Sequence, residues 1–278
     1  MANNKPIRIA FALYGDVWYN FYIAFMLHEF NEKELSITED DAPILTWHHG
    51  DDVSRPPYLH PLYASNGQAV TDDTSIGHQH PPGICFTHGT VNAAPLNHDE
   101  ITRETDAASA RFSVVTTWKV SKEPFLIETC TVEVHPRQTE AQVLDMEISL
   151  QAPSSPLEFA GDIGLGYLAV EMEYRKAADA DGRIGESEVN GNISAWGTLC
   201  GLTAAEQAAV GVAILPHPSN GETMFHAEDV SFGYLFAQAT PFKVDAGSTH
   251  TLKYRVLAYT GDLFTIDVWG YHQDYTDT

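Results

Sequence analysis

Alternation of apolar and polar residues predicts β-strands in most of the second half of the chain. Residues 111–120 are rich in β-branched and aromatic side chains, and residues 126–134 and 142–150 alternate apolar residues with polar or charged ones. A strand with one face in a core and the other face in water has this alternation. Further runs of this kind occupy residues 211–215, 230–237 and 251–258.

Turn residues separate these runs, and helix signals are few. Proline or glycine occurs in each of the segments 122–124, 152–156, 181–182 and 245–247, which are typical of turns. Residues 24–34 and 203–209 are the two short helix candidates, and Thr203 with Glu206 would form a capping box in the second. The pattern predicts an all-β fold, a large antiparallel β-sandwich with few short helices, built as one domain from residues 1–278.

The apolar segment 9–27 has the composition of a membrane anchor. Gly15, Asp16 and Asn20 interrupt it, whereas a spanning helix needs about twenty apolar residues with few breaks. Two buried strands joined near Gly15 and Asp16 fit its aromatic and β-branched residues better. We therefore expect no membrane anchor.

The charge of the chain indicates which partners to expect, and its cysteine content indicates the cellular compartment. The chain has 15 Lys and Arg against 38 Asp and Glu, a formal net charge of −23. Such a chain repels phosphate groups, so neither nucleic acid nor an anionic membrane is an expected partner. The three cysteines, Cys85, Cys130 and Cys200, form no paired motif and are typical of reduced thiols, so a cytoplasmic location is expected.

Histidines concentrate in one part of the chain. Seven of the 13 lie between Trp47 and His98, and the densest run reads GHQHPPGICFTHGTVN at residues 77–92. Imidazole can ligate a metal, donate and accept hydrogen bonds, and transfer protons near neutral pH. We predict that the functional site lies in this region, with His78, His80 and His88 as catalytic residues.

These three histidines could bind a divalent metal. His78 and His80 are two residues apart and would project on one face of an extended chain, and His88 would add a third ligand after the turn at residues 81–83. No carboxylate lies at a diagnostic spacing, so the histidines could instead line a metal-free polar pocket or have a purely structural role.

Five further residues are candidates for substrate binding. Arg55 and His60 lie in the proline-rich segment RPPYLHP, where a guanidinium and an imidazole could hold a carboxylate or sugar hydroxyls. Arg55 could instead form a surface ion pair with a neighbouring aspartate. The remaining three candidates are Asn92, His217 and His226; His217 begins the turn HPSNG.

Five ordered motifs resemble the PmoA-like family of bacterial and fungal proteins over about residues 44–263. They read ILTWHHGDD, RPPYLHPLYASNGQAVT, GHQHPPGICFTHGTVN, GRIGESEVNGNISAW, and VGVAILPHPSN followed by FGYLFAQATPF. The positions that match the family pattern are Arg55, His60, His78, His80, His88, Asn92, His217 and His226. The chain departs from the pattern at Pro81 and Pro82, where relatives usually have histidine and arginine, and after Asp162, where they often have Lys-Glu.

The resemblance implies a β-supersandwich similar to galactose mutarotases and a small-molecule carbohydrate as the ligand. The predicted function is a carbohydrate-active enzyme, a lyase, hydrolase or epimerase of a sugar or keto-sugar, with histidines as acid and base. The lost arginine removes an anion clamp and implies a different substrate or weaker catalysis.

Two further functions remain open at the level of the sequence. One is a non-catalytic sugar-binding protein, and the second is an oxygenase whose metal is bound by His78, His80 and His88. For any of the three functions, the histidines lie in loops that contain proline and glycine, and such loops often form binding sites. We therefore predict that the following residues lie in one cleft: His60, His78, His80, His88 and His217.

Overall fold

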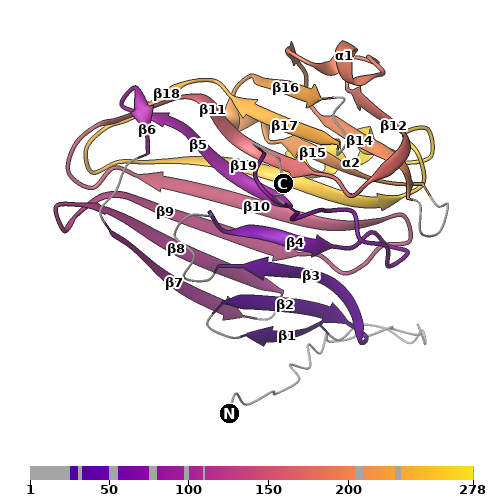
Figure 1. Ribbon diagram of the computed structural model, residues 1–278, viewed down its shortest axis with the longest axis horizontal. Coiled ribbons are helices and arrows are strands. Elements are labelled where there is room, and N and C mark those ends of the chain that lie inside the picture. Colours follow the sequence, from indigo (N-terminus) through magenta and orange to yellow (C-terminus); the bar gives the residue numbers. More distant parts are fainter. Residues whose placement is uncertain are drawn as a thin grey trace, which may run out of the picture.

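Two antiparallel β-sheets packed face to face form the fold (Figure 1). The computed structural model describes residues 26–30, 33–49, 56–74, 80–96, 100–108, 110–203, 209–228 and 233–277. The two sheets confirm the predicted all-β antiparallel sandwich.

The larger sheet has eleven strands in the described part of the chain. Their order across the sheet is β1 (Met26–Phe30), β2 (Glu34–Glu39), β3 (Ala42–His48), β4 (Tyr58–Leu62), β5 (Ile84–Val91), β11 (Leu157–Leu168), β17 (Tyr234–Ala239), β16 (Thr223–Glu228) and β13 (Asn192–Ile193). The short strands β18 (Phe242–Val244) and β6 (Ala94–Pro95) pair with β11 and β5.

The smaller sheet has eight strands among the residues that the structure describes. Their order is β12 (Met172–Asp179), β14 (Gly197–Thr203), β15 (Ala209–Pro216), β19 (Thr249–Thr260), β10 (Ala141–Gln151), β9 (Glu123–Val134), β8 (Arg111–Val120) and β7 (Glu100–Ala108). Each strand pairs antiparallel with its neighbours.

One hydrophobic cluster fills the space between the sheets and contains residues from Leu35 to Ala258. Trp47 of β3 and Phe112 of β8 meet within it, with ring centroids 5.6 Å apart. In both sheets buried residues alternate with more exposed ones, as in β2 and β8. The alternation read from the sequence therefore reflects strands that bury one face against the opposite sheet.

The predicted strands are confirmed where the structure describes them. Strand β8 has the predicted bounds 111–120, and β9, β10, β15 and β19 contain the runs 126–134, 142–150, 211–215 and 251–258. Of the run 230–237, residues 234–237 lie in β17, Gly233 precedes that strand, and residues 230–232 lie outside the described part. The turn predicted at 122–124 lies slightly earlier, because Ser121 and Lys122 have φ of 53° and 69° and β9 already begins at Glu123. Positive φ at both central residues matches the twist of a tight hairpin.

The helices differ from those predicted. The helix expected at residues 24–34 is wrong over Met26–Phe30, because these residues form β1 and pair with β2 from Met26 to Phe30. In the second candidate, Thr203 ends β14 and Ala209 begins β15, and residues 204–208 lie outside the described part. The observed helices are α1 (Glu186–Val189), α2 (Val268–Thr276) and a 3₁₀ turn at Pro218–Asn220.

Helix α2 was not predicted because its sequence, VWGYHQDYT, contains a glycine and several aromatic residues with weak helix propensity. Asp267 caps it by accepting a hydrogen bond from the backbone N–H of Gly270 at 3.0 Å. Val268 packs into a second hydrophobic cluster on the outer side of the eight-stranded sheet. Capping and docking therefore stabilise a helix that its local sequence does not favour.

The two strands predicted within residues 9–27 lie outside the described residues except for Met26 and Leu27, which belong to β1. No helix in the described segments has the length and apolar character needed to cross a membrane.

Candidate functional site

A transverse row of side chains crosses the outer face of the eleven-stranded sheet. Residues directly opposite each other on antiparallel strands project on the same face. Six strand pairings align seven residues in this way, and we call these seven residues the outer row. They are Glu34, His48, Tyr58, Cys85, Gly166, Phe236 and His226. Their chain neighbours Trp47, Leu59 and Leu235 lie in the core, so the outer row faces away from it.

Four rings form a ladder where this row crosses β16 and β17. The rings of His80 and Tyr234 stack with centroids 4.0 Å apart and 20° between planes. Tyr234 and Phe236 are 6.2 Å and 12° apart, and Phe236 and His226 are 6.3 Å and 30° apart. This ring ladder places two imidazoles and a phenol on an otherwise apolar strip.

His80 has a carboxylate partner in the ring ladder. Its Nε2 lies 3.2 Å from Oε2 of Glu228, the last residue of β16, and Glu228 pairs in register with Tyr234. Since a carboxylate accepts and does not donate, the proton of neutral His80 belongs on Nε2, and the lone pair remains on Nδ1. The pair therefore has the arrangement of a histidine base held by a carboxylate.

The hydroxyl of Tyr234 lies over Gly166 on β11. A Cβ atom added to Gly166 would be only 2.7 Å from Oη of Tyr234, so only glycine leaves room for this hydroxyl. Burial, followed by the nearby groups Cys85, Asp162 and Glu228, raises the pKa of Tyr234 above its ordinary value. Tyr234 therefore keeps its proton and can donate it, and no other described residue accepts it.

His226, at the other end of the ring ladder, is held by two amides. Gln238 donates from Nε2 to the carbonyl of Gly161 at 2.6 Å, which directs its Oε1 to Nε2 of His226, also at 2.6 Å. The side chain of Asn190 lies 3.2 Å from Nδ1 of the same ring. Because both ring nitrogens have partners, His226 fits a ligand-contacting role better than proton transfer.

His60 lies on β4 and projects to the same side as Tyr58, two residues away. Its Nδ1 is 3.1 Å from the hydroxyl of Thr71, and its Nε2 is 3.4 Å from Asp73. Burial lowers the pKa of His60, and the charge of Asp73 opposes that shift. The structure therefore brings three predicted residues, His60, His80 and His226, to the outer side of one sheet.

Cys85 is a buried member of the outer row. Burial, with a further contribution from Glu128, raises the pKa of its thiol. A protonated, buried thiol is a poor nucleophile.

His88 points the opposite way from the outer row. Its Nε2 makes a very short contact with Oε2 of Glu128, which lies on β9 of the other sheet. The two side chains are 9% and 5% exposed, and Trp118 and Phe86 meet the imidazole edge-on at 5.3 and 5.5 Å. His88 and Glu128 therefore form a buried pair that joins the two sheets.

The predicted convergence of the histidines on one cleft is therefore wrong for His88 and also for His217. His217 begins the 3₁₀ turn after β15 and lies on the eight-stranded sheet. Asn92 lies in the turn after β5 with φ of 54°, and its side chain accepts a hydrogen bond from the backbone of Glu158 at 3.0 Å. Arg55 and His78 lie outside the described residues, so the roles predicted for them stay predictions.

The predicted metal ligand set does not form either. His80 and His88 lie on opposite sides of the eleven-stranded sheet and cannot share one cation. Within the segments that the structure describes, no group of three His, Cys, Asp or Glu side chains is arranged to hold a metal ion.

The sequence prediction missed Glu228, Tyr234, Phe236 and Gln238. A signal for three of them was present, because Tyr234, Phe236 and Gln238 alternate with Leu235 and Ala237 along β17. In a strand with a buried face, that alternation places the aromatic and amide side chains together on the other face.

Comparison with known proteins gives a family and a distant structural likeness. The model of a family of unknown function (DUF6807) matches residues 34–269. No curated protein matches the chain significantly. The resemblance to the PmoA-like family stays a prediction.

Among solved structures, a polysaccharide lyase is similar at 11% identity and a TM-score of 0.31, over 86% of this chain and 33% of the lyase. The chain thus spans only a third of the length of that lyase. A likeness of this size carries no inference about activity.

Proposed function

The chain belongs to this family of unknown function, and we propose that it is a carbohydrate-active enzyme that removes the proton next to the carbonyl of a keto-sugar at the ring ladder. The observation that carries the proposal is the His80–Glu228 pair at 3.2 Å, stacked on Tyr234. A base and a hydroxyl donor in contact are the two groups that such a reaction needs.

In the proposed step, Nδ1 of His80 takes the proton from the carbon next to the carbonyl. The C–H bond breaks, an N–H bond forms, and the electron pair moves onto the carbonyl oxygen to give an enolate. Glu228 stabilises the imidazolium, and the hydroxyl of Tyr234 donates a hydrogen bond to the enolate oxygen. Protonation of the other face of the carbon by a solvent water molecule, while His80 releases its proton to solvent, gives epimerisation; departure of a hydroxyl group from the next carbon, protonated by the imidazolium of His80 to leave as water, gives elimination.

The apolar part of the ring ladder supports a sugar as the ligand. Small-molecule sites combine apolar and aromatic walls with a few polar groups that fix orientation. Phe236 is 4% exposed and lies between Tyr234 and His226, whose polar atoms flank it. Because Phe236 is almost buried, a sugar would meet mainly the polar atoms on either side of it, and these suit the hydroxyl groups of the ligand.

A non-catalytic sugar-binding protein is the second candidate function. It is favoured by the occupied nitrogens of His226, which fix a ring for contact and not for proton transfer. A metal-dependent oxygenase built on His78, His80 and His88 is not proposed, because His80 and His88 lie on opposite sides of the sheet.

The Tyr234→Phe variant is expected to exchange the proton next to the carbonyl of a keto-sugar about 10²–10³-fold more slowly than the wild type, because one oxyanion donor is lost. Deuterium incorporation from D₂O, followed by proton NMR over a panel of keto-sugars, measures this rate. Tyr271→Phe is the matched control, since its hydroxyl donates to Gln138 at 2.8 Å away from the ring ladder.

Equal rates for wild type and Tyr234→Phe would contradict the proposed step. Binding of a keto-sugar without any exchange by the wild type would support the sugar-binding function in place of the enzyme.

A further inference from the structure

A polar pocket lies on the outer face of the eight-stranded sheet, beside α2. It has a volume of about 230 Å³ and is lined by charged side chains from β8, β9, β10 and β19 together with His217 and Tyr275. The ring ladder belongs to the other sheet, so this pocket and the ring ladder are separate.

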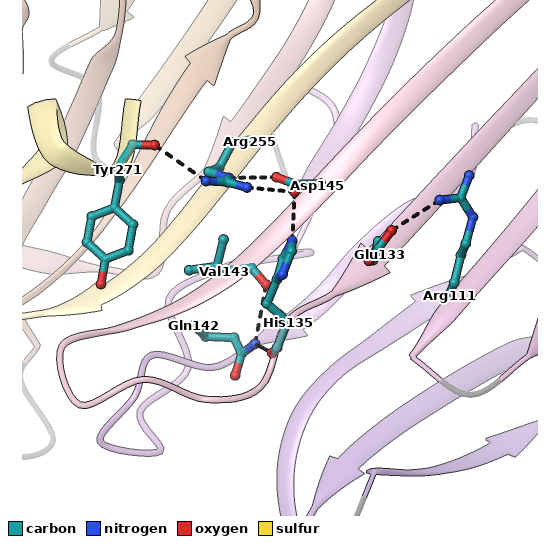
Figure 2. A network of polar contacts seen from close by, with 8 residues as sticks. All are labelled: Arg111, Glu133, His135, Gln142, Val143, Asp145, Arg255 and Tyr271. Atoms are coloured by element: carbon teal, nitrogen blue, oxygen red, sulfur yellow. Dashed lines mark hydrogen bonds and ion pairs between the residues drawn. The ribbon is translucent and has the colours of Figure 1, made fainter. Parts of the chain in front are cut away.

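The strand register explains why charges gather in this pocket. Arg111, Glu133, Asp145 and Arg255 stand opposite one another on β8, β9, β10 and β19 and so share one face of the sheet. Figure 2 shows this row, with Arg111 directed to Glu133 and Arg255 directed to Asp145. Glu147 and Lys253 form the next row along β10 and β19.

Every charge named in these rows has a partner. Arg111 lies 3.1 Å from Glu133, Lys253 lies 3.8 Å from Glu147, and Arg255 donates to Asp145 at 2.7 and 2.8 Å. Although burial opposes the shift, hydrogen bonds from Arg255 and His135 hold the pKa of Asp145 below its ordinary value. An anionic, cationic or zwitterionic ligand would have to displace one of these partners.

His217 adds a neutral donor to the lining. Burial, followed by the charge of Lys253, lowers the pKa of His217. Its Nδ1 accepts a hydrogen bond from the backbone N–H of Ser219 at 3.1 Å, so the proton of the neutral ring lies on Nε2.

Tyr275 of α2 forms an aromatic wall of the pocket. The guanidinium of Arg255 covers its ring at 4.7 Å, and the ring of His217 meets it edge-on at 5.3 Å. These contacts fix the side chain in place.

We propose that this pocket is a second carbohydrate site, which binds one neutral sugar ring. Paired carboxylates and cations keep unused lone pairs and N–H groups, and these can bind hydroxyls without breaking an ion pair. The volume is below the roughly 300–1,000 Å³ of pockets for drug-sized ligands, which suits a single sugar ring. The site does not depend on the chemistry proposed for the ring ladder.

Isothermal titration calorimetry on the full chain tests this site apart from the proposed reaction, because none of the probes is a keto-sugar. The probes are a methyl hexoside, a uronic acid and a zwitterionic amino acid. We expect the methyl hexoside to bind most tightly, and Lys253→Met or Glu147→Gln to weaken its binding about tenfold or more, because each removes a charged hydrogen-bonding group. Both residues are exposed and weakly paired, so both variants should fold.

Lys243→Met is the matched control, since Lys243 forms a similarly exposed pair with Asp245 at 3.6 Å outside the pocket. Unchanged hexoside affinity in both pocket variants, tighter binding of the uronic acid or amino acid, or no binding of the hexoside would each overturn the proposal. Failure of proton exchange at the ring ladder would leave this titration unaffected, so the two proposals can fail separately.

Discussion

The His80→Gln variant is expected to lose about 10²–10⁴-fold of the rate of keto-sugar proton exchange, the range that a positioned general base contributes. Glutamine keeps a planar amide against Tyr234 but cannot accept a proton at neutral pH. Deuterium incorporation from D₂O measures the loss, with kcat and KM determined separately. We expect kcat to fall while KM changes little, because the apolar part of the ring ladder is intact.

His250→Gln is the matched control for this variant. His250 stacks on Phe242 with centroids 4.0 Å apart and 26° between planes, much as His80 stacks on Tyr234, but it lies on β19 of the other sheet. We expect full activity for His250→Gln. Similar losses in both variants would show that removal of a stacked imidazole, and not loss of a base, causes the effect.

Glu128→Ala is expected to lower the free energy of unfolding by about 3–5 kcal/mol, because it leaves the imidazole of His88 without its partner in the core. Both side chains are almost fully buried between the sheets and are flanked by Trp118 and Phe86. Urea unfolding followed by tryptophan fluorescence measures the change.

Two further variants test whether the stabilisation comes from the burial of this pair or from the attraction of its charges alone. Glu133→Ala breaks the exposed pair with Arg111 and should cost at most about 1 kcal/mol. Replacing His88 and Glu128 together by leucine should recover most of the loss, since a well-packed apolar pair needs no hydrogen bond. A cost for Glu128→Ala no larger than that of Glu133→Ala would show that the pair does not stabilise the sandwich.

The sequence was a good guide to the fold because three long neighbouring strands of the eight-stranded sheet bury one face and expose the other to solvent. Strands β8, β9 and β10 alternate so regularly that their positions follow from the residues alone. Strand β1 could not be predicted from local signals, because its pairing with β2 and not its own sequence makes it a strand.

The site was only partly predictable for a related reason. Residue type predicts a site in the histidine-rich region, but the side to which each histidine points depends on the phase of the strand. In β5, Cys85 and Phe86 are both buried although they point to opposite faces, so the sequence does not reveal that His88 faces the core. Partners such as Glu128, 40 residues away, follow only from the packing of the two sheets.

The most direct test of the central claim is a titration of the protein with a keto-sugar, followed by NMR of the ¹⁵N-labelled imidazoles. Single histidine-to-glutamine variants assign the resonances, and His250 of β19, on the other sheet, serves as the internal reference. We expect the resonances of His80 and His226 to shift together and saturate, while that of His250 stays fixed. A saturating titration in which His80 and His226 do not move would contradict the assignment of the ring ladder as the sugar site.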